Sequence, residues 1–136
     1  MRLPDTPADR TARRQRLVLR VCAAACVATI AVLSLLPADQ LARTGANHAL
    51  EHFIAYCGTA ASLVLAGGRD GRRWPAVAAL VLYAGLLELI QHLAPGRSPG
   101  LPEFIAGSAG ALFGTLAASG ALALLLRSRF AGLYRL

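Results

Sequence analysis

The stretch from Trp74 to Gly100, WPAVAALVLYAGLLELIQHLAPGRSPG, sets the fold class of this chain. It begins with an almost unbroken apolar run of about 20 residues, the length that a helix needs to cross a hydrocarbon core roughly 30 Å thick. Glu88, Gln91 and His92 interrupt the run near its end, and a turn with two prolines and two glycines follows. The stretch therefore predicts a membrane-spanning helix that carries polar groups where it leaves the bilayer.

The rest of the chain repeats this pattern. Of its 136 residues, 56% are hydrophobic and 15% are charged, which is typical of an integral membrane protein. Short segments rich in helix breakers separate four apolar runs, at residues 17–36, 49–67, 74–93 and 102–126. The sequence predicts an all-α bundle of four antiparallel transmembrane helices over residues 17–126. Residues 1–16 are predicted to form a disordered basic arm, and residues 127–136 a basic tail.

Arginine placement predicts the orientation. All 14 basic residues are Arg, and the net charge is +7. Six Arg precede or open the first run, three lie between the second and third runs, and three end the chain; only Arg43 and Arg97 fall on the other side. The positive-inside rule then puts both termini in the cytoplasm. No motif for nucleic acid accompanies the charge, and no small-x-small site follows the first run, so we expect neither a nucleic-acid partner nor a cleaved signal peptide.

Polar residues gather at the opposite, extracytoplasmic end. They are His48, Glu51, His52 and Tyr56 in the second run, Glu88, Gln91 and His92 in the third, and Glu103 at the start of the fourth. The spacing i, i+3, i+4 recurs in the second and third runs and puts each set on one helix face. Two polar faces can therefore point at each other, although a single His at such a place is more often a packing residue.

Glu88 is the member of this group whose placement inside the membrane should cost the most free energy. We expect it about six residues, roughly 9 Å, below the end of its helix. An unpaired carboxylate there is penalised by several kcal/mol, so Glu88 should be protonated, paired or exposed to a water-filled cavity. Arg97, on the following turn, is the candidate partner in the sequence.

Small residues predict close helix packing. Ala106, Gly110, Gly114 and Ala118 recur every four residues in the fourth run, and Gly58, Ser62 and Ala66 do so in the second. We expect these strips to pack within the bundle, with a homodimer as the alternative. Cys22, Cys26 and Cys57 lie in apolar runs without metal-ligand spacing and are interpreted as small packing residues.

Three motifs, HFIAY, ELIQHLAPGR and GALFG, occur in this order between residues 47 and 120, and with them the chain resembles the VanZ-like family of bacterial membrane proteins. The resemblance implies an all-helical protein of the bacterial cytoplasmic membrane; founding members are associated with resistance to glycopeptides of the teicoplanin type. The matching positions are His52, Tyr56, Glu88, Gln91, Arg97 and Glu103. The chain departs from the family pattern at Glu103, commonly Asp, and at Gly107, commonly Asn.

Two classes of function stay open. In the first, the extracytoplasmic polar group binds a membrane lipid or a lipid-linked cell-wall precursor, with Arg97 on a phosphate. Gln91, Tyr56, Glu51 and His48 are the other candidate ligand-binding residues. In the second, the protein is an enzyme acting on a lipid headgroup, with Glu88 or Glu103 as general base and His52 or His92 as acid partner. We expect no cofactor; a metal site is the weaker version, since no signature such as HExxH occurs.

Overall fold

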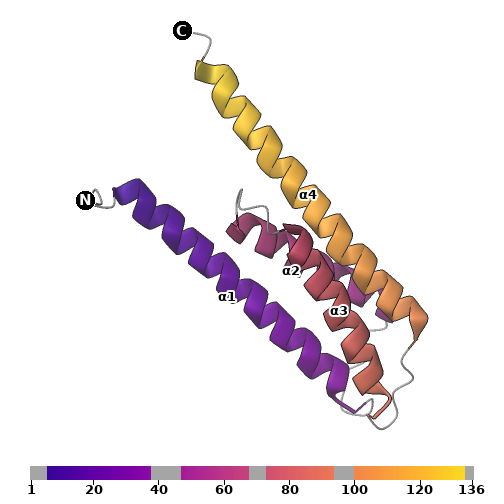
Figure 1. Ribbon diagram of the computed structural model, residues 1–136. Coiled ribbons are helices and arrows are strands. Elements are labelled where there is room, and N and C mark those ends of the chain that lie inside the picture. The colour runs from indigo at the N-terminus through magenta and orange to yellow at the C-terminus, as the bar shows by residue number, and fades with distance from the viewer. Residues whose placement is uncertain (1–5, 38–46, 68–72, 94–99, 134–136) are drawn as a thin grey trace.

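The computed structural model describes residues 6–37, 47–67, 73–93 and 100–133. They form four helices, α1 (Pro7–Leu35), α2 (His48–Gly67), α3 (Arg73–Gln91) and α4 (Leu101–Leu133). All four helices are long and apolar enough to cross a membrane. Successive helices run in opposite directions, so the start of α1 and the end of α4 lie at the same end of the bundle (Figure 1). The predicted all-α bundle of four antiparallel transmembrane helices is confirmed.

Helix α1 begins earlier than the apolar pattern predicts. Residues 7–16, predicted as part of a disordered arm, are helical. The Thr6 hydroxyl accepts a hydrogen bond from the Asp9 N–H at 3.2 Å, and the Asp9 carboxylate accepts one from the Thr6 N–H at 3.0 Å. This capping box satisfies two N–H groups that a helix start leaves unpaired, and Pro7 in the first turn has none to lose. The prediction of a disordered arm is therefore wrong for residues 7–16, and α4 likewise continues through residues 127–133 of the predicted tail.

Helix α2 is the centre of the bundle. It contacts each of the other three helices, α4 most extensively, whereas α1 and α4 do not touch in the part of the chain that the structure describes. A Cβ atom on Gly110 or Gly114 of α4 would clash with the backbone carbonyl oxygen of Phe53 or Cys57 of α2. The two helix backbones meet directly at these glycines, which confirms that the α4 strip packs inside the bundle.

The predicted strip on α2 does not face this contact throughout. Gly58 is exposed, and nothing lies within 4 Å of the place that its Cβ would occupy. The prediction for Gly58 is wrong, because α2 meets α4 with the backbone of Phe53 and Cys57 instead. Two of the cysteines also differ from the interpretation: Cys22 and Cys26 are exposed on α1 rather than packed in the bundle.

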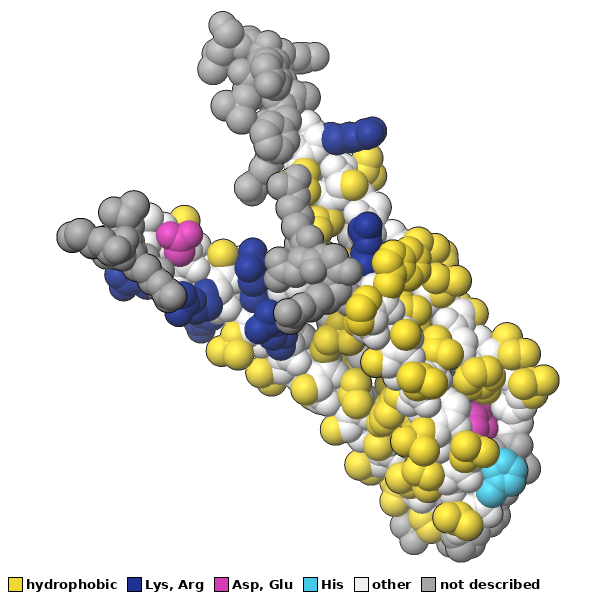
Figure 2. Space-filling view, viewed as in Figure 1, with side chains coloured by type: hydrophobic (Ala, Val, Ile, Leu, Met, Phe, Trp, Pro, Cys, Tyr) yellow, Lys and Arg dark blue, Asp and Glu magenta, His cyan; other side chains and the backbone are white. Residues whose placement is uncertain are grey.

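The interior is small and partly polar, while the exterior is apolar. Thr59 and Thr115 are fully buried, and their hydroxyls donate to carbonyls one turn earlier in their own helices. Large apolar side chains on all four helices are exposed, and they cover most of the face in Figure 2. This distribution suits a bilayer, where lipid covers the apolar exterior and buried polar groups must bond inside the protein.

Tyr83 connects α3 to α1. Its hydroxyl donates a hydrogen bond of 2.7 Å to the carbonyl oxygen of Val27. One side chain thereby fixes the position of α3 along the axis of α1. These two helices run in the same direction.

Candidate functional site

The Glu88 carboxylate joins α3 to the start of α4. Its Oε2 accepts a hydrogen bond of 3.1 Å from the backbone N–H of Gly100. Gly100 precedes the first residue of α4, and its carbonyl accepts hydrogen bonds from the N–H groups of Glu103 and Phe104. The first N–H groups of a helix lack intrahelical acceptors and form the positive end of its dipole. The carboxylate of Glu88 therefore lies where a negative charge is stabilised.

Glu88 is closer to the end of its helix than the sequence predicts. Helix α3 ends at Gln91, so Glu88 lies three residues, about 4.5 Å, before that end rather than roughly 9 Å. The predicted partner Arg97 lies outside the described residues. The partner that the structure identifies is the N–H of Gly100, which sequence reasoning missed. The signal was the sequence GLPE, in which a glycine stands three residues before, and a proline directly before, the acidic residue in the first turn of α4.

A second carboxylate reaches the same backbone. Glu103 is half-buried in the first turn of α4, and its Oε2 lies 2.7 Å from the place where Gly100 would carry a Cβ. A glutamate at this position commonly folds back over the start of its helix. Glu88 and Glu103, from different helices, therefore both lie against Gly100.

Helix α2 contributes a phenol and an imidazole. Tyr56 is buried, and its ring lies near that of Tyr83 on α3, with ring centroids 6.5 Å apart. Its ring lies against Gly107 of α4, where a Cβ would stand 3.1 Å from the ring, so the glycine at this position makes room for the tyrosine. His52 stacks on Tyr56 one turn earlier, with ring centroids 6.3 Å apart and an interplanar angle of 18°. Tyr56 of α2 therefore lies against both α3 and α4.

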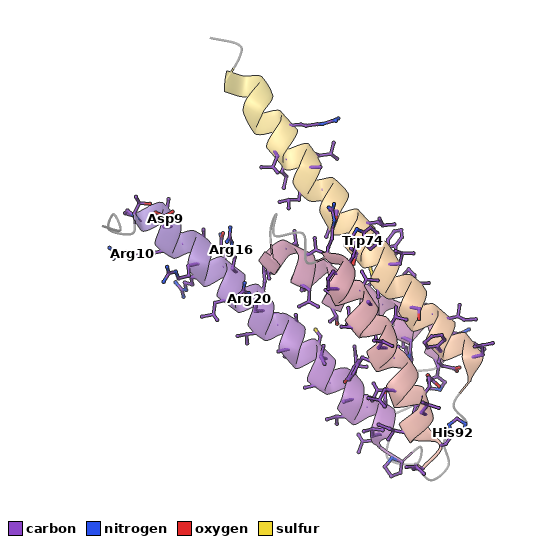
Figure 3. All side chains as sticks on the ribbon, viewed as in Figure 1. Asp9, Arg10, Arg16, Arg20, Trp74 and His92 are labelled. Atoms are coloured by element: carbon purple, nitrogen blue, oxygen red, sulfur yellow. The ribbon has the colours of Figure 1, made fainter. Side chains whose placement is uncertain are left out.

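Two of the other predicted residues, His48 and His92, are exposed. His48 is exposed, and its Nδ1 lies 3.4 Å from the Glu51 carboxylate in the first turn of α2, so these two pair with each other at the rim. His92 is exposed near the end of α3 (Figure 3), with Nδ1 3.0 Å from the backbone oxygen of Glu88. Its ring therefore contacts the backbone of its own helix rather than the Glu88 carboxylate. Gln91 is buried in the last turn of α3.

We call the group formed by His52, Tyr56, Glu88 and Glu103 the polar centre. It contains hydrogen-bond acceptors and one imidazole, a set suited to hydroxyl or amine groups and to proton transfer. Among the described residues, no three His, Cys, Asp or Glu side chains come together as metal ligands. Comparisons of the chain with protein-family models, curated proteins and solved structures found no match.

Proposed function

We propose that this chain is a VanZ-like protein of the bacterial cytoplasmic membrane that binds a cell-envelope lipid or a lipid-linked cell-wall precursor at the extracytoplasmic end of its bundle. The observation that carries the proposal is the Glu88 carboxylate of α3, which accepts a hydrogen bond from Gly100 at the start of α4, where the Glu103 carboxylate also lies. Carboxylates of two helices are thereby gathered near one end of the bundle.

The surroundings of the polar centre suit an amphipathic ligand. Large apolar side chains are exposed at the same end of the bundle: Leu50, Ile54, Leu89, Leu93, Leu101 and Ile105. Figure 2 shows a histidine and an acidic side chain among apolar groups at the end away from the arginines. A lipid that approaches within the leaflet meets both kinds of surface. Its chains would lie on the apolar side chains, and its headgroup hydroxyls or amines would donate to the carboxylates.

Expression in a susceptible bacterium tests this proposal. The strains carry wild type, Glu88→Gln, or Asp9→Asn as the matched change of carboxylate to amide at the other end of the bundle. We expect wild type and Asp9→Asn to lower susceptibility to teicoplanin and Glu88→Gln to lose that effect, with unchanged envelope lipids by mass spectrometry. Full protection by Glu88→Gln, at equal protein levels in the membrane, would contradict the proposal.

An enzyme acting on lipid headgroups is the second candidate. It is favoured by the stacking of His52 on Tyr56, which puts an imidazole beside a phenol on one face of α2. A carboxylate and an imidazole placed together can supply general acid and base catalysis. The same strains separate the two functions. A lipid species present with wild type and Asp9→Asn but absent with Glu88→Gln would identify an enzyme.

A further inference from the structure

The end of the bundle opposite the polar centre is strongly basic. Dark blue side chains gather there in Figure 2. The described members are Arg10, Arg13, Arg14, Arg16 and Arg20 on α1, Arg73 on α3 and Arg127 on α4. Within the described segments, no salt bridge joins Arg16, Arg20 or Arg73 to an acidic side chain. Among the described side chains, none neutralises these three guanidinium groups.

The arginines of α1 lie on two different faces. Residues seven apart share a helix face. Arg16 is in register with Ala23, which is buried, and Arg20 with Val27, which packs against the core. Figure 3 likewise shows Arg16 and Arg20 on the side of α1 toward α2 and α4. This bundle-side pair therefore continues the packed face of α1 beyond the bundle core.

Arg10 and Arg14 belong to the outward face instead. They are in register with Leu17 and Val21, whose side chains are 61% and 59% exposed. The outward pair and the bundle-side pair carry the same charge on one helix. They differ in the side of α1 that they occupy and by six residues, about 9 Å, in depth, so the outward pair is the control of equal charge for the bundle-side pair.

The bundle-side pair also lies at the depth of the bilayer surface. The hydrogen bond from Tyr83 to Val27 aligns α3 with α1, which run in the same direction. At 1.5 Å per residue, Trp74 lies about 13 Å from Tyr83 along α3. Along α1, Arg20 lies about 10 Å and Arg16 about 16 Å from Val27, on the same side of the hydrogen bond. An exposed Trp near a helix end is typical of the membrane interface. Arg16 and Arg20 therefore bracket the level at which lipid phosphates begin.

We propose that Arg16 and Arg20 bind the phosphate of an anionic phospholipid in the leaflet at this end of the bundle. A guanidinium group presents a planar fork that matches phosphate oxygens, and basic sites between membrane helices recognise anionic headgroups in this way. The depth favours a lipid over an acidic protein segment. An acidic segment would bind the outward pair equally well, because that pair lies farther from the bilayer core. This site is separate from the polar centre and does not depend on its function.

Native mass spectrometry of the purified full chain tests the site. The protein is released from micelles that hold equal amounts of phosphatidylglycerol and phosphatidylcholine. We expect wild type to retain phosphatidylglycerol preferentially and the double variant R16Q/R20Q to lose roughly thirtyfold in affinity for it, because each Arg near an anionic surface contributes a factor of about five. The matched variant R10Q/R14Q, with the same change in charge, should keep the preference.

Equal losses in the two double variants would overturn the proposal, since charge alone would then explain retention. Equal retention of the two lipids by wild type would overturn it as well. If R16Q/R20Q does not fold, R16K/R20K replaces it as the test variant because it keeps the charge, and R10K/R14K is then its matched control. We expect only R16K/R20K to weaken retention of phosphatidylglycerol, because a lysine lacks the planar fork; equal retention by these two would contradict the site.

Discussion

The carboxylate of Glu88 is stabilised by a backbone group that cannot be identified from the sequence alone. Helical spacing predicted that Glu88 lies on a polar face near the end of its helix, and Arg97 was the only cation nearby in the sequence. The structure instead identifies the N–H of Gly100, at the positive end of α4. Side chains can be read from the sequence, whereas the direction of an unpaired backbone N–H depends on how α3 and α4 meet. This is why the residue was predicted and its partner was not.

The hydrogen bond between Glu88 and Gly100 leads to a prediction about the start of α4. In Glu88→Leu the Gly100 N–H loses its acceptor, and a hydrogen bond to a charged group contributes about 1.5–3 kcal/mol. We expect its amide hydrogen exchange to become at least tenfold faster, by roughly the factor that 1.4 kcal/mol represents. Glu88→Gln keeps an acceptor oxygen and should fall between wild type and Glu88→Leu. Unchanged exchange at Gly100 in Glu88→Leu would show that the bond does not stabilise this helix start.

The Tyr83 hydroxyl leads to a prediction about the attachment of α1. Tyr83→Phe removes the 2.7 Å hydrogen bond to Val27 while keeping the ring. Hydrogen bonds between membrane helices contribute about 0.6 kcal/mol on average and up to roughly 1.7 kcal/mol. We expect a loss of unfolding free energy in this range, measured by denaturation in bicelles. Thr115→Val is the control, because the Thr115 hydroxyl bonds only within α4 and its loss should cost less. An equal cost for both changes would argue against a role in joining helices.

The packing of α2 on α4 shows what a small-residue pattern can and cannot predict. A strip of Gly and Ala lets another backbone approach, and α4 uses Gly110 and Gly114 in this way. The pattern does not say which helix approaches or which of its faces does so. For this reason the strip on α4 was predicted correctly, while Gly58 of α2 was not. The partner face depends on the crossing of the two helices, which no local spacing encodes.

Substitution along this contact should be strongly position-dependent. Gly110→Leu would drive a side chain into the carbonyl of Phe53, and backbone cannot move aside as a flexible side chain does. We expect a loss of at least 1–3 kcal/mol in unfolding free energy, the usual cost of overpacking, or failure to insert. Gly120→Leu is the matched control, because nothing lies within 4 Å of its missing Cβ. Similar unfolding free energies for the two variants in bicelles would contradict the close contact.

The number of helices in the bundle follows from hydropathy, but the lengths of the two longest helices do not. Four apolar runs predicted four spans, and all four exist. Helices α1 and α4, of 29 and 33 residues, extend beyond their apolar runs. Hydropathy marks only the part of a helix that lipid can cover, whereas its continuation depends on capping and on helix-forming residues such as Ala and Arg. At 1.5 Å per residue α1 and α4 are about 43 Å and 50 Å long, so they project into the headgroups or beyond.

The orientation of the bundle follows from where these projecting ends carry charge. The five arginines of α1, with Arg73 and Arg127, lie at the end where the chain begins and α4 ends, while Glu88 and Glu103 lie at the other. Since arginine-rich segments stay on the cytoplasmic side, the polar centre should face outward. Reporter domains fused after Arg72 and after Arg129 should therefore be active in the cytoplasm, and reporters at Gly45 and Gly100 outside it. Replacing the α1 arginines by Gln should weaken this bias and give mixed topologies. Reporters with the reverse pattern in the wild-type chain would put the polar centre inside the cell and contradict binding of an extracytoplasmic ligand.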